Sequence, residues 1–280
     1  MMYEKHGEEI RIYNHYTNSK ERLHIKTLCD LFNDMAEVHT KQLGVDVATL
    51  NKKGQTWMLR QIHIRLIDMP KKEERVWFET WASGIHGLFI NRDYRVLSKR
   101  KEKNGMVMRD VMRAYAHTEW MVIDIARRRP ERPMELLKVQ AEWCKEKIED
   151  MPSLFTRLEA KGDFSGLQGE WSDPCFCKAN FDDIDFNGHV TQSSYVQWLM
   201  DGLSFGFMRG HELIEIEVVY ENEIQPESAV KVFCLEQASS LAGQCVITHL
   251  VKDKTEKILH SFGRSVWREI GGAEPPGWKL

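Results

Sequence analysis

The spacing of apolar residues predicts a long amphipathic helix near the start of the chain. From Thr27 to Gly44, apolar side chains recur every three or four residues, which places them on one helical face. The residues of this face are Leu28, Leu31, Phe32, Met35 and Val38. Runs of strand-forming residues follow between polar turns, and they predict strands at 57–67, 75–83, 88–98 and 111–124.

The second half of the chain repeats this order of elements. A predicted helix at 190–203 precedes predicted strands at 212–224, 229–239, 242–252 and 257–270. Pro70 and Pro226 each end the first strand of their half and begin a turn. The last strands alternate small residues with a closing tryptophan, and the matched residues are Ala116, Thr118 and Trp120 with Gly263, Ser265 and Trp267. Any two helix-plus-sheet units look somewhat alike, but the shared order and the paired landmarks favour an internal duplication.

A helix followed by antiparallel strands, used twice, predicts an α+β fold of the double hotdog type. Two long helices are each wrapped by a curved antiparallel β-sheet, in a tandem repeat within one chain. Small residues in the last strands suit a sheet that passes close to a helix. We predict an N-terminal hotdog at 1–130, a linker at 131–172 with one helix near Met134–Ile148, and a C-terminal hotdog at 173–280.

Composition narrows the class of protein. The chain has 280 residues, is 42% hydrophobic and 29% charged, and has a formal net charge of −3, so a broad nucleic-acid-binding surface is not indicated. The first residues are charged, which argues against a secretory signal, and no apolar run is long enough to span a membrane. Six cysteines in a chain of this size are typical of reduced thiols in a cytosolic protein, so we expect a cytoplasmic location. Cys175 and Cys177 lack a second pair with zinc spacing and are interpreted as strand residues.

The stretch "DDIDFNGHVTQSSY" at 182–195 first suggests a calcium loop. Asp183, Asp185, Asn187 and Gly188 match its first, third, fifth and sixth positions. The twelfth position needs a bidentate glutamate, but Ser194 occupies it, and the preceding segment alternates like a strand instead of a helix. We therefore expect no metal here.

The same stretch also suits acid–base chemistry. Asp185, Asn187 and His189 alternate, so in an extended chain their side chains point to one side. His189 can transfer protons, Asp185 can orient it, and Asn187 can donate to a carbonyl oxygen. A helix follows at once, with an N-cap among residues 191–193, and its free N–H groups can stabilise an oxyanion. The residue types leave open a plainer interpretation, a polar turn whose Asp and Asn side chains bond only to nearby backbone.

At this point the chain resembles the acyl-acyl carrier protein thioesterase family. The segment "DIDFNGHVTQSSYVQWLMDGL" is similar to the family's active-site pattern D-x-D-x-N-x-H-V-N-N-x-x-Y-x-x-W, and Tyr195 and Trp198 match as well. In the first half, "TLCDLFNDMAEVHTKQLG", "WMLRQIHIRL" and "ERVWFETWASG" look like the family's N-terminal hotdog. Because the given sequence starts directly with this hotdog, without a transit peptide before it, we expect the bacterial relatives of the plant enzymes to be the closer match.

The resemblance implies the catalytic residues Asp185, Asn187, His189 and Glu223. Glu223 is the match because "YENEIQP" occupies the place of a family segment like R-R-E-C. Ile224 stands where plant members often have a cysteine, which favours attack by water, although Glu223 as nucleophile stays open. Thr191–Gln192 replace the family's two asparagines. Aligning Pro70 with Pro226 puts Ile67 opposite Glu223, and the first half has no Asp-x-Asn-x-His, so it is expected to be non-catalytic.

The activity implied is hydrolysis of a fatty acyl-acyl carrier protein (ACP) thioester to free fatty acid and holo-ACP, without a cofactor. The partner is then an acyl carrier protein bearing a phosphopantetheine-linked acyl chain. Apolar residues expected along an acyl tunnel are Trp57, Met58, Tyr195 and Trp198. Basic residues available to an acidic carrier are Lys52, Lys53, Arg60, Lys71, Lys72 and Arg127–Arg129. Alternatives left open are an acyl-CoA thioesterase, a hotdog hydratase or dehydratase, and a lipid- or calcium-binding module, as either a monomer or a homodimer.

Overall fold

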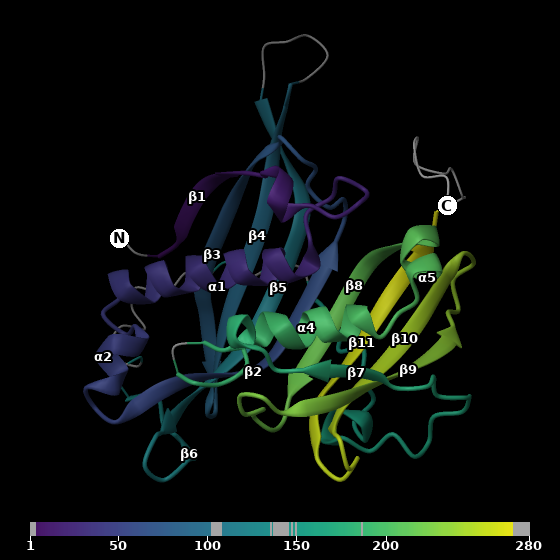
Figure 1. Cartoon of the computed structure of the whole chain (residues 1–280). Helices are drawn as coiled ribbons and strands as arrows, with labels where there is room; N and C mark the ends of the chain where they lie inside the picture. The colour runs from purple at the N-terminus through teal and green to yellow at the C-terminus, as the bar shows by residue number, and fades with distance from the viewer. Residues whose placement is uncertain are drawn as a thin grey trace. The chain divides into compact units, whose positions relative to one another are not determined.

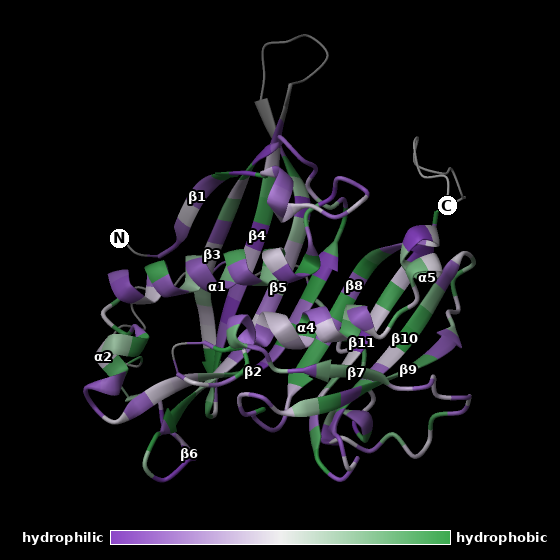
Figure 2. Cartoon of the chain, viewed as in Figure 1, coloured by the Kyte–Doolittle hydropathy of each residue, from purple (hydrophilic) through white to green (hydrophobic). Residues whose placement is uncertain are grey.

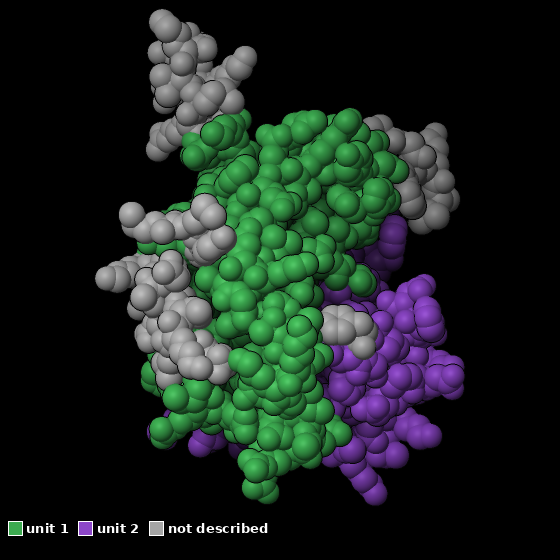
Figure 3. Space-filling model, turned by 90° about the vertical axis from the view of Figure 1, so that its left-hand side faces the viewer, with its two compact units in different colours: residues 1–151 green, residues 152–280 purple. Residues whose placement is uncertain are grey.

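The chain forms two compact units, Met1–Met151 and Pro152–Leu280, which Figure 3 distinguishes by colour. The computed structural model describes residues 4–101, 108–134, 136, 146, 148, 150–185 and 187–270. We call the two units the N-terminal unit and the C-terminal unit. Most of the predicted helix at 134–148 lies outside the described residues.

The N-terminal unit is an antiparallel sheet with a long helix across it (Figure 1). Its strands are β1 (His6–Arg11), β2 (Gln55–Leu66), β3 (Arg75–His86), β4 (Phe89–Lys101), β5 (Met108–Asp124) and β6 (Arg129–Glu131). They lie in the order β1-β3-β4-β5-β2, and β6 pairs with β5. Its α-helices are α1 (Ile25–Gln42) and α2 (Val47–Asn51).

Helix α1 is the helix that the first apolar pattern predicts. Leu28, Phe32 and Met35 are buried, and the Phe32 ring lies 4.6 Å from the ring of Tyr94, centroid to centroid. The expectation for Val38 is wrong, because at 3.6 residues per turn it falls beside this stripe and is 39% exposed. Neither α1 nor any other helix among the described residues is long and apolar enough to cross a membrane.

The C-terminal unit repeats the arrangement strand for strand. Its strands are β7 (Cys175–Lys178), β8 (His211–Tyr220), β9 (Ala229–Ala238), β10 (Gln244–Asp253) and β11 (Leu259–Glu269). They lie in the order β7-β9-β10-β11-β8, which matches β1-β3-β4-β5-β2. Its α-helices are α4 (Gln192–Asp201) and α5 (Phe205–Gly210), of which α4 corresponds to α1. In Figure 2 the strands alternate between apolar and polar residues, as a sheet with two different faces requires.

The tryptophans at the ends of the last strands, Trp120 and Trp267, make the same contact in both units. Trp120 donates its indole N–H to the Thr118 hydroxyl at 2.9 Å, and Trp267 donates to the Ser265 hydroxyl at 2.7 Å. This shared contact supports the duplication, and the prediction of two helix-and-sheet repeats of the hotdog type is confirmed.

The segment at 152–172 packs on the outer face of the C-terminal sheet. The Ser153 hydroxyl donates to the buried carboxylate of Glu217 at 2.9 Å, and Arg264 pairs with Glu159. The ring of Phe155 packs edge-on against Phe262 at 5.0 Å. The compact units therefore divide at 151/152, inside the segment 131–172 that the sequence marks as a linker.

Gly263, on β11, lies where α4 packs directly against the sheet. A Cβ atom placed on it would stand 2.6 Å from Cδ1 of the fully buried Leu199 and 3.4 Å from the carbonyl oxygen of Glu217. The contact of 2.6 Å would force the buried Leu199 side chain to shift from its packed position.

We expect Gly263→Ala to lower the free energy of unfolding by about 1–3 kcal/mol, which is the usual cost of overpacking a core. Urea denaturation measures it. Gly84→Ala is the matched control, because a Cβ at this β3 glycine would meet nothing within 4 Å. Equal stability of the two variants would contradict the close approach of α4.

Candidate active site

The described residues from Ile184 to Val190 form a tight loop directly before helix α4. Ile184 and Val190 pair as an antiparallel bridge, and the Asp185 N–H donates to the His189 carbonyl at 2.8 Å. Gly188 takes φ = +80°, which glycine adopts without strain. The sequence-based expectation of an extended chain is therefore wrong here, because the backbone turns back on itself.

The Asp185 carboxylate organises this loop from inside. Its Oδ1 accepts the backbone N–H of Asn187 at 2.8 Å and that of His189 at 3.2 Å, and its Oδ2 accepts the Asn187 side-chain amide at 3.4 Å. Asp185 thus positions His189 through the backbone. This is the local bonding of the plainer interpretation, and it also fixes the backbone from which the His189 side chain extends.

Asp183 joins the loop to α4. Its carboxylate accepts the Asn180 N–H at 2.9 Å and the Ser194 hydroxyl at 2.8 Å. Thr191 is the N-cap of α4, and its hydroxyl accepts the Ser194 N–H, as the sequence predicts for residues 191–193. The carboxylates of the calcium-like pattern are thus acceptors for protein donors. Within the described ranges, no three or more His, Cys, Asp or Glu side chains are grouped to hold a metal ion.

Glu223 comes within reach of His189. Its Oε2 lies 3.4 Å from His189 Nε2, and the two side chains are 37% and 36% exposed, so the pair is open to solvent and to a substrate. Glu223 lies in the turn after β8, although the sequence predicts a strand through residue 224. The strand ends earlier because the N–H groups of Glu221 and Asn222 both donate to the one carbonyl of His260.

Tyr195 holds the turn on both sides of Glu223. Its hydroxyl donates to the Asn222 carbonyl at 3.4 Å and accepts the Ile224 N–H at 3.1 Å. Burial raises the pKa of Tyr195, and the nearby Glu223 charge raises it further, so the phenol stays protonated. The sequence places Tyr195 among tunnel residues. Its role as a clamp depends on contacts between α4 and a turn that no local pattern reveals.

The other predicted tunnel residues have different surroundings. Trp198 is buried on α4, with its ring 5.7 Å from that of Tyr195. Trp57 lines a cavity within the N-terminal unit, whereas Met58 is half-buried on β2 and is not among the residues described as lining it. The structure thus brings together Asp185, Asn187, His189 and Glu223 within the C-terminal unit, whereas Trp57 belongs to the N-terminal unit.

Among the described residues, neither position 224 nor Cys234 supports a thiol nucleophile. Position 224 is a buried isoleucine. Cys234 is buried with its Sγ 3.4 Å from Nδ1 of His249, and burial raises its pKa to about 12. A thiol in this state is a weak nucleophile.

The loop before α1 is the N-terminal counterpart of this site. The Leu23 N–H donates to the Pro70 carbonyl at 2.8 Å, as the Val190 N–H donates to the Ile224 carbonyl at 3.3 Å. These bonds make Pro70 the structural match of Ile224. The residue opposite Glu223 is therefore Met69 instead of Ile67.

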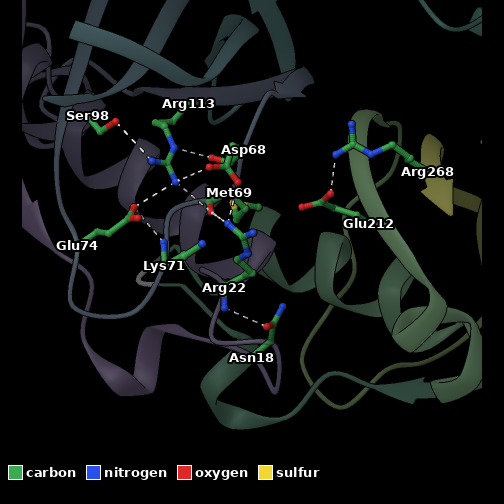
Figure 4. Close-up of polar contacts among 10 residues, drawn as sticks. All are labelled: Asn18, Arg22, Asp68, Met69, Lys71, Glu74, Ser98, Arg113, Glu212 and Arg268. Carbon is green, nitrogen blue, oxygen red and sulfur yellow. Dashed lines mark hydrogen bonds and ion pairs between the residues drawn. The ribbon is translucent and has the colours of Figure 1, made fainter. Parts of the chain in front are cut away.

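In the N-terminal unit, ion pairs connect the loop before α1 with the turn after β2 (Figure 4). Asp68 pairs with Arg22 at 2.7 Å and with Arg113 at 2.9 Å, and Arg113 also pairs with Glu74 at 3.1 Å. The network ties the loop before α1 to the turn after β2. In the described network the carboxylates of Asp68 and Glu74 pair with guanidinium groups, in contrast to the carboxylate–imidazole pair of Glu223 and His189.

Comparison with known proteins places the chain in a family. The model of the acyl-ACP thioesterase N-terminal domain matches residues 4–139, and that of the C-terminal domain matches residues 176–269. Oleoyl-acyl carrier protein thioesterase 2 of Arabidopsis thaliana is 22% identical over 220 residues, which are 74% of this chain and 56% of that protein. The chain thus spans less than two thirds of the length of this relative.

Two solved structures share the fold over nearly the whole chain. A protein designated an oleoyl thioesterase from Lactobacillus plantarum superposes with a TM-score of 0.79 at 22% identity, covering 96% of this chain and 97% of that one. The 12:0-ACP thioesterase of Umbellularia californica gives 0.75 at 16% identity, covering 95% and 94%. The resemblance noted in the sequence is confirmed by the two domain matches, and the chain belongs to the acyl-ACP thioesterase family.

Proposed function

We propose that this protein hydrolyses the thioester of a fatty acyl-acyl carrier protein to a free fatty acid and holo-ACP. The observation that carries the proposal is the 3.4 Å approach of Glu223 to His189 beside the N-terminus of α4. A carboxylate next to an imidazole at an accessible position is suited to activating water. Membership of the family supplies the substrate class.

In this mechanism Glu223, with His189, takes a proton from water as the water oxygen attacks the thioester carbonyl carbon. The carbonyl electrons form an oxyanion, which Asn187 and free N–H groups at the start of α4 stabilise. The tetrahedral intermediate then collapses and the C–S bond breaks. The departing thiolate of the phosphopantetheine arm receives the proton. Asp185 holds the backbone of Asn187 and His189 in place throughout.

Asn187 is suited to the oxyanion role because its own hydrogen bond is weak. Its amide donates to Asp185 at 3.4 Å, near the limit for such a bond, and the residue is exposed. The amide can therefore turn toward a carbonyl oxygen at little cost.

The carrier is proposed to be acyl carrier protein because the relatives named above act on it. Lys52, Lys53 and Arg127–Arg129 are exposed on the N-terminal unit and are candidates for contact with an acidic carrier. Trp57, on the wall of a cavity, is a candidate for contact with an aliphatic chain.

A thiol-release assay tests the substrate class directly. We expect hydrolysis of acyl-ACP over a limited range of chain lengths, with the same acyl group on CoA hydrolysed more slowly. Equal or faster turnover of acyl-CoA would point to the acyl-CoA alternative. Gain or loss of water without release of the carrier, followed by mass spectrometry, would point to a hydratase or dehydratase.

Glu223→Gln tests the acid–base pair. The change keeps the size of the side chain but removes its basicity, so we expect kcat for acyl-ACP hydrolysis to fall about 10²–10⁴-fold with little change in KM. Glu227→Gln is the matched control, since this exposed glutamate lies in the same turn, and it should keep full activity. Near-full hydrolysis by Glu223→Gln would reject the assignment.

Tyr195→Phe tests the clamp on the turn that carries Glu223. The change leaves the buried Ile224 N–H without its acceptor, so we expect a loss of about 1–3 kcal/mol in stability and a fall in kcat. Tyr220→Phe is the control, because its hydroxyl also donates to α4, at the Gln192 carbonyl. If both variants keep the wild-type kcat, Tyr195 does not position Glu223.

A further inference from the structure

Phe181 has the largest exposed fraction among the large apolar side chains of the described residues. It is 92% exposed and is the first residue of the short 3-10 turn η4 (Phe181–Asp183). Single apolar side chains on a protein surface are ordinary. Three features of its surroundings distinguish this one: the rigidity of its backbone, its position beside the candidate catalytic residues and the charges around it.

The turn that carries Phe181 is bonded to the start of α4. The Asn180 N–H donates to the Asp183 carboxylate at 2.9 Å, and these two residues form a reciprocal capping box around the turn. The Asp183 carbonyl accepts the Thr191 N–H at 2.7 Å, and Thr191 is the N-cap of α4. The backbone of Phe181 is therefore held at a fixed place relative to the N-terminus of this helix.

The same turn is bonded on its other side to the loop that carries Glu223. The Ala179 N–H donates to the Ser228 carbonyl at 2.9 Å, and the Glu227 N–H donates to the Ala179 carbonyl at 3.0 Å. Glu227 and Ser228 end the turn between β8 and β9, in which Glu223 lies. Phe181 thus belongs to a segment that is fixed between the two parts of the chain holding the candidate catalytic pair.

The charges of this rim, residues 178–183 and 221–228, do not favour an acidic partner. Most of its exposed charged side chains are acids, and they are Asp182, Glu221, Glu223 and Glu227, beside Lys178. An acidic carrier gains no attraction from such a surface, since like charges repel. A contact that binds the carrier here therefore has to be apolar, and aromatic side chains supply much of the binding energy of protein interfaces.

We propose that Phe181 contacts the protein part of the substrate and so selects an acyl group on a carrier protein over the same group on CoA. This role rests on the proposed function, because the carrier reaches Phe181 only when its thioester enters the candidate site. Thioesters of the two carriers share the phosphopantetheine arm, so the candidate catalytic pair meets the same atoms in both. A carrier protein adds a folded surface that can bury a phenyl ring, whereas CoA adds a charged nucleotide. Because the turn is rigid before binding, the contact requires little ordering of the chain.

Kinetics of Phe181→Ala on the two carriers test this role. We expect KM for acyl-ACP to rise about 10–30-fold, the usual effect of truncating a residue central to an interface, with kcat at saturation unchanged. KM and kcat for the same acyl group on CoA should stay at the wild-type values, because CoA offers the ring no protein surface. Phe181→Trp keeps an exposed aromatic ring and should keep the preference for ACP.

Phe176→Ala is the matched control for these measurements. Phe176 is 69% exposed on β7, and Nζ of Lys231 lies 5.7 Å from the centre of its ring. Its truncation removes the same exposed ring from outside the turn that carries Phe181. We expect this variant to keep the wild-type KM for both carriers.

Direct binding separates this role from the hydrolase function. Surface plasmon resonance of the full chain with holo-ACP should give a Kd about 10–30-fold weaker for Phe181→Ala, whereas His189→Ala should bind as the wild type does. The proposal is overturned if Phe181→Ala keeps the wild-type KM and Kd, if its KM changes equally on both carriers, or if the wild type does not bind holo-ACP. Weaker binding by Phe181→Ala, together with no thiol release by the wild type, would reject only the proposed function.

Discussion

The hydroxyl group of Tyr195 joins helix α4 to the turn that carries Glu223, and the arrangement of the candidate site depends on this link. Glu223 itself lies outside regular structure, in the turn after β8, whose backbone needs a constraint to hold one direction. Bonds from one phenol to the residues on either side of it supply that constraint. The imidazole partner is held in an equivalent way, because Asp185 binds the backbone N–H groups of its loop. Both candidate catalytic side chains thus lie on backbone that is held by hydrogen bonds beside them.

The duplication shows which parts of this arrangement belong to the fold and which to the site. Both units keep the strand order, the tryptophan-to-hydroxyl bond and the bond from the loop before the helix to the turn after the first long strand. The two units differ in the side chains of the turn after the first long strand and of the loop before the helix. One unit has an acid–imidazole pair there, and the other has ion pairs of Asp68 with two arginines.

Much of this fold follows from periodicity in the sequence. The long helix and strands of each half were predictable because their buried faces recur with the period of their structure. Strand β1 was not, since "HGEEIR" is half-exposed and has one large apolar residue, Ile10. The identities of His189 and Glu223 followed from the family resemblance, but their geometry did not. The loop turns at Gly188, and the strand ends before Glu223, for reasons set by contacts distant in sequence.

The central claim is that Glu223 and His189 act as one unit on water. A double-mutant cycle in kcat/KM for acyl-ACP hydrolysis, with His189→Ala, Glu223→Gln and the double variant, measures this most directly. If two residues act as one unit, removing either one already removes their joint contribution to the rate. The double variant should therefore be about as slow as the slower single variant. If the two losses instead multiply, the residues act independently, and the 3.4 Å approach of their side chains does not carry the chemistry.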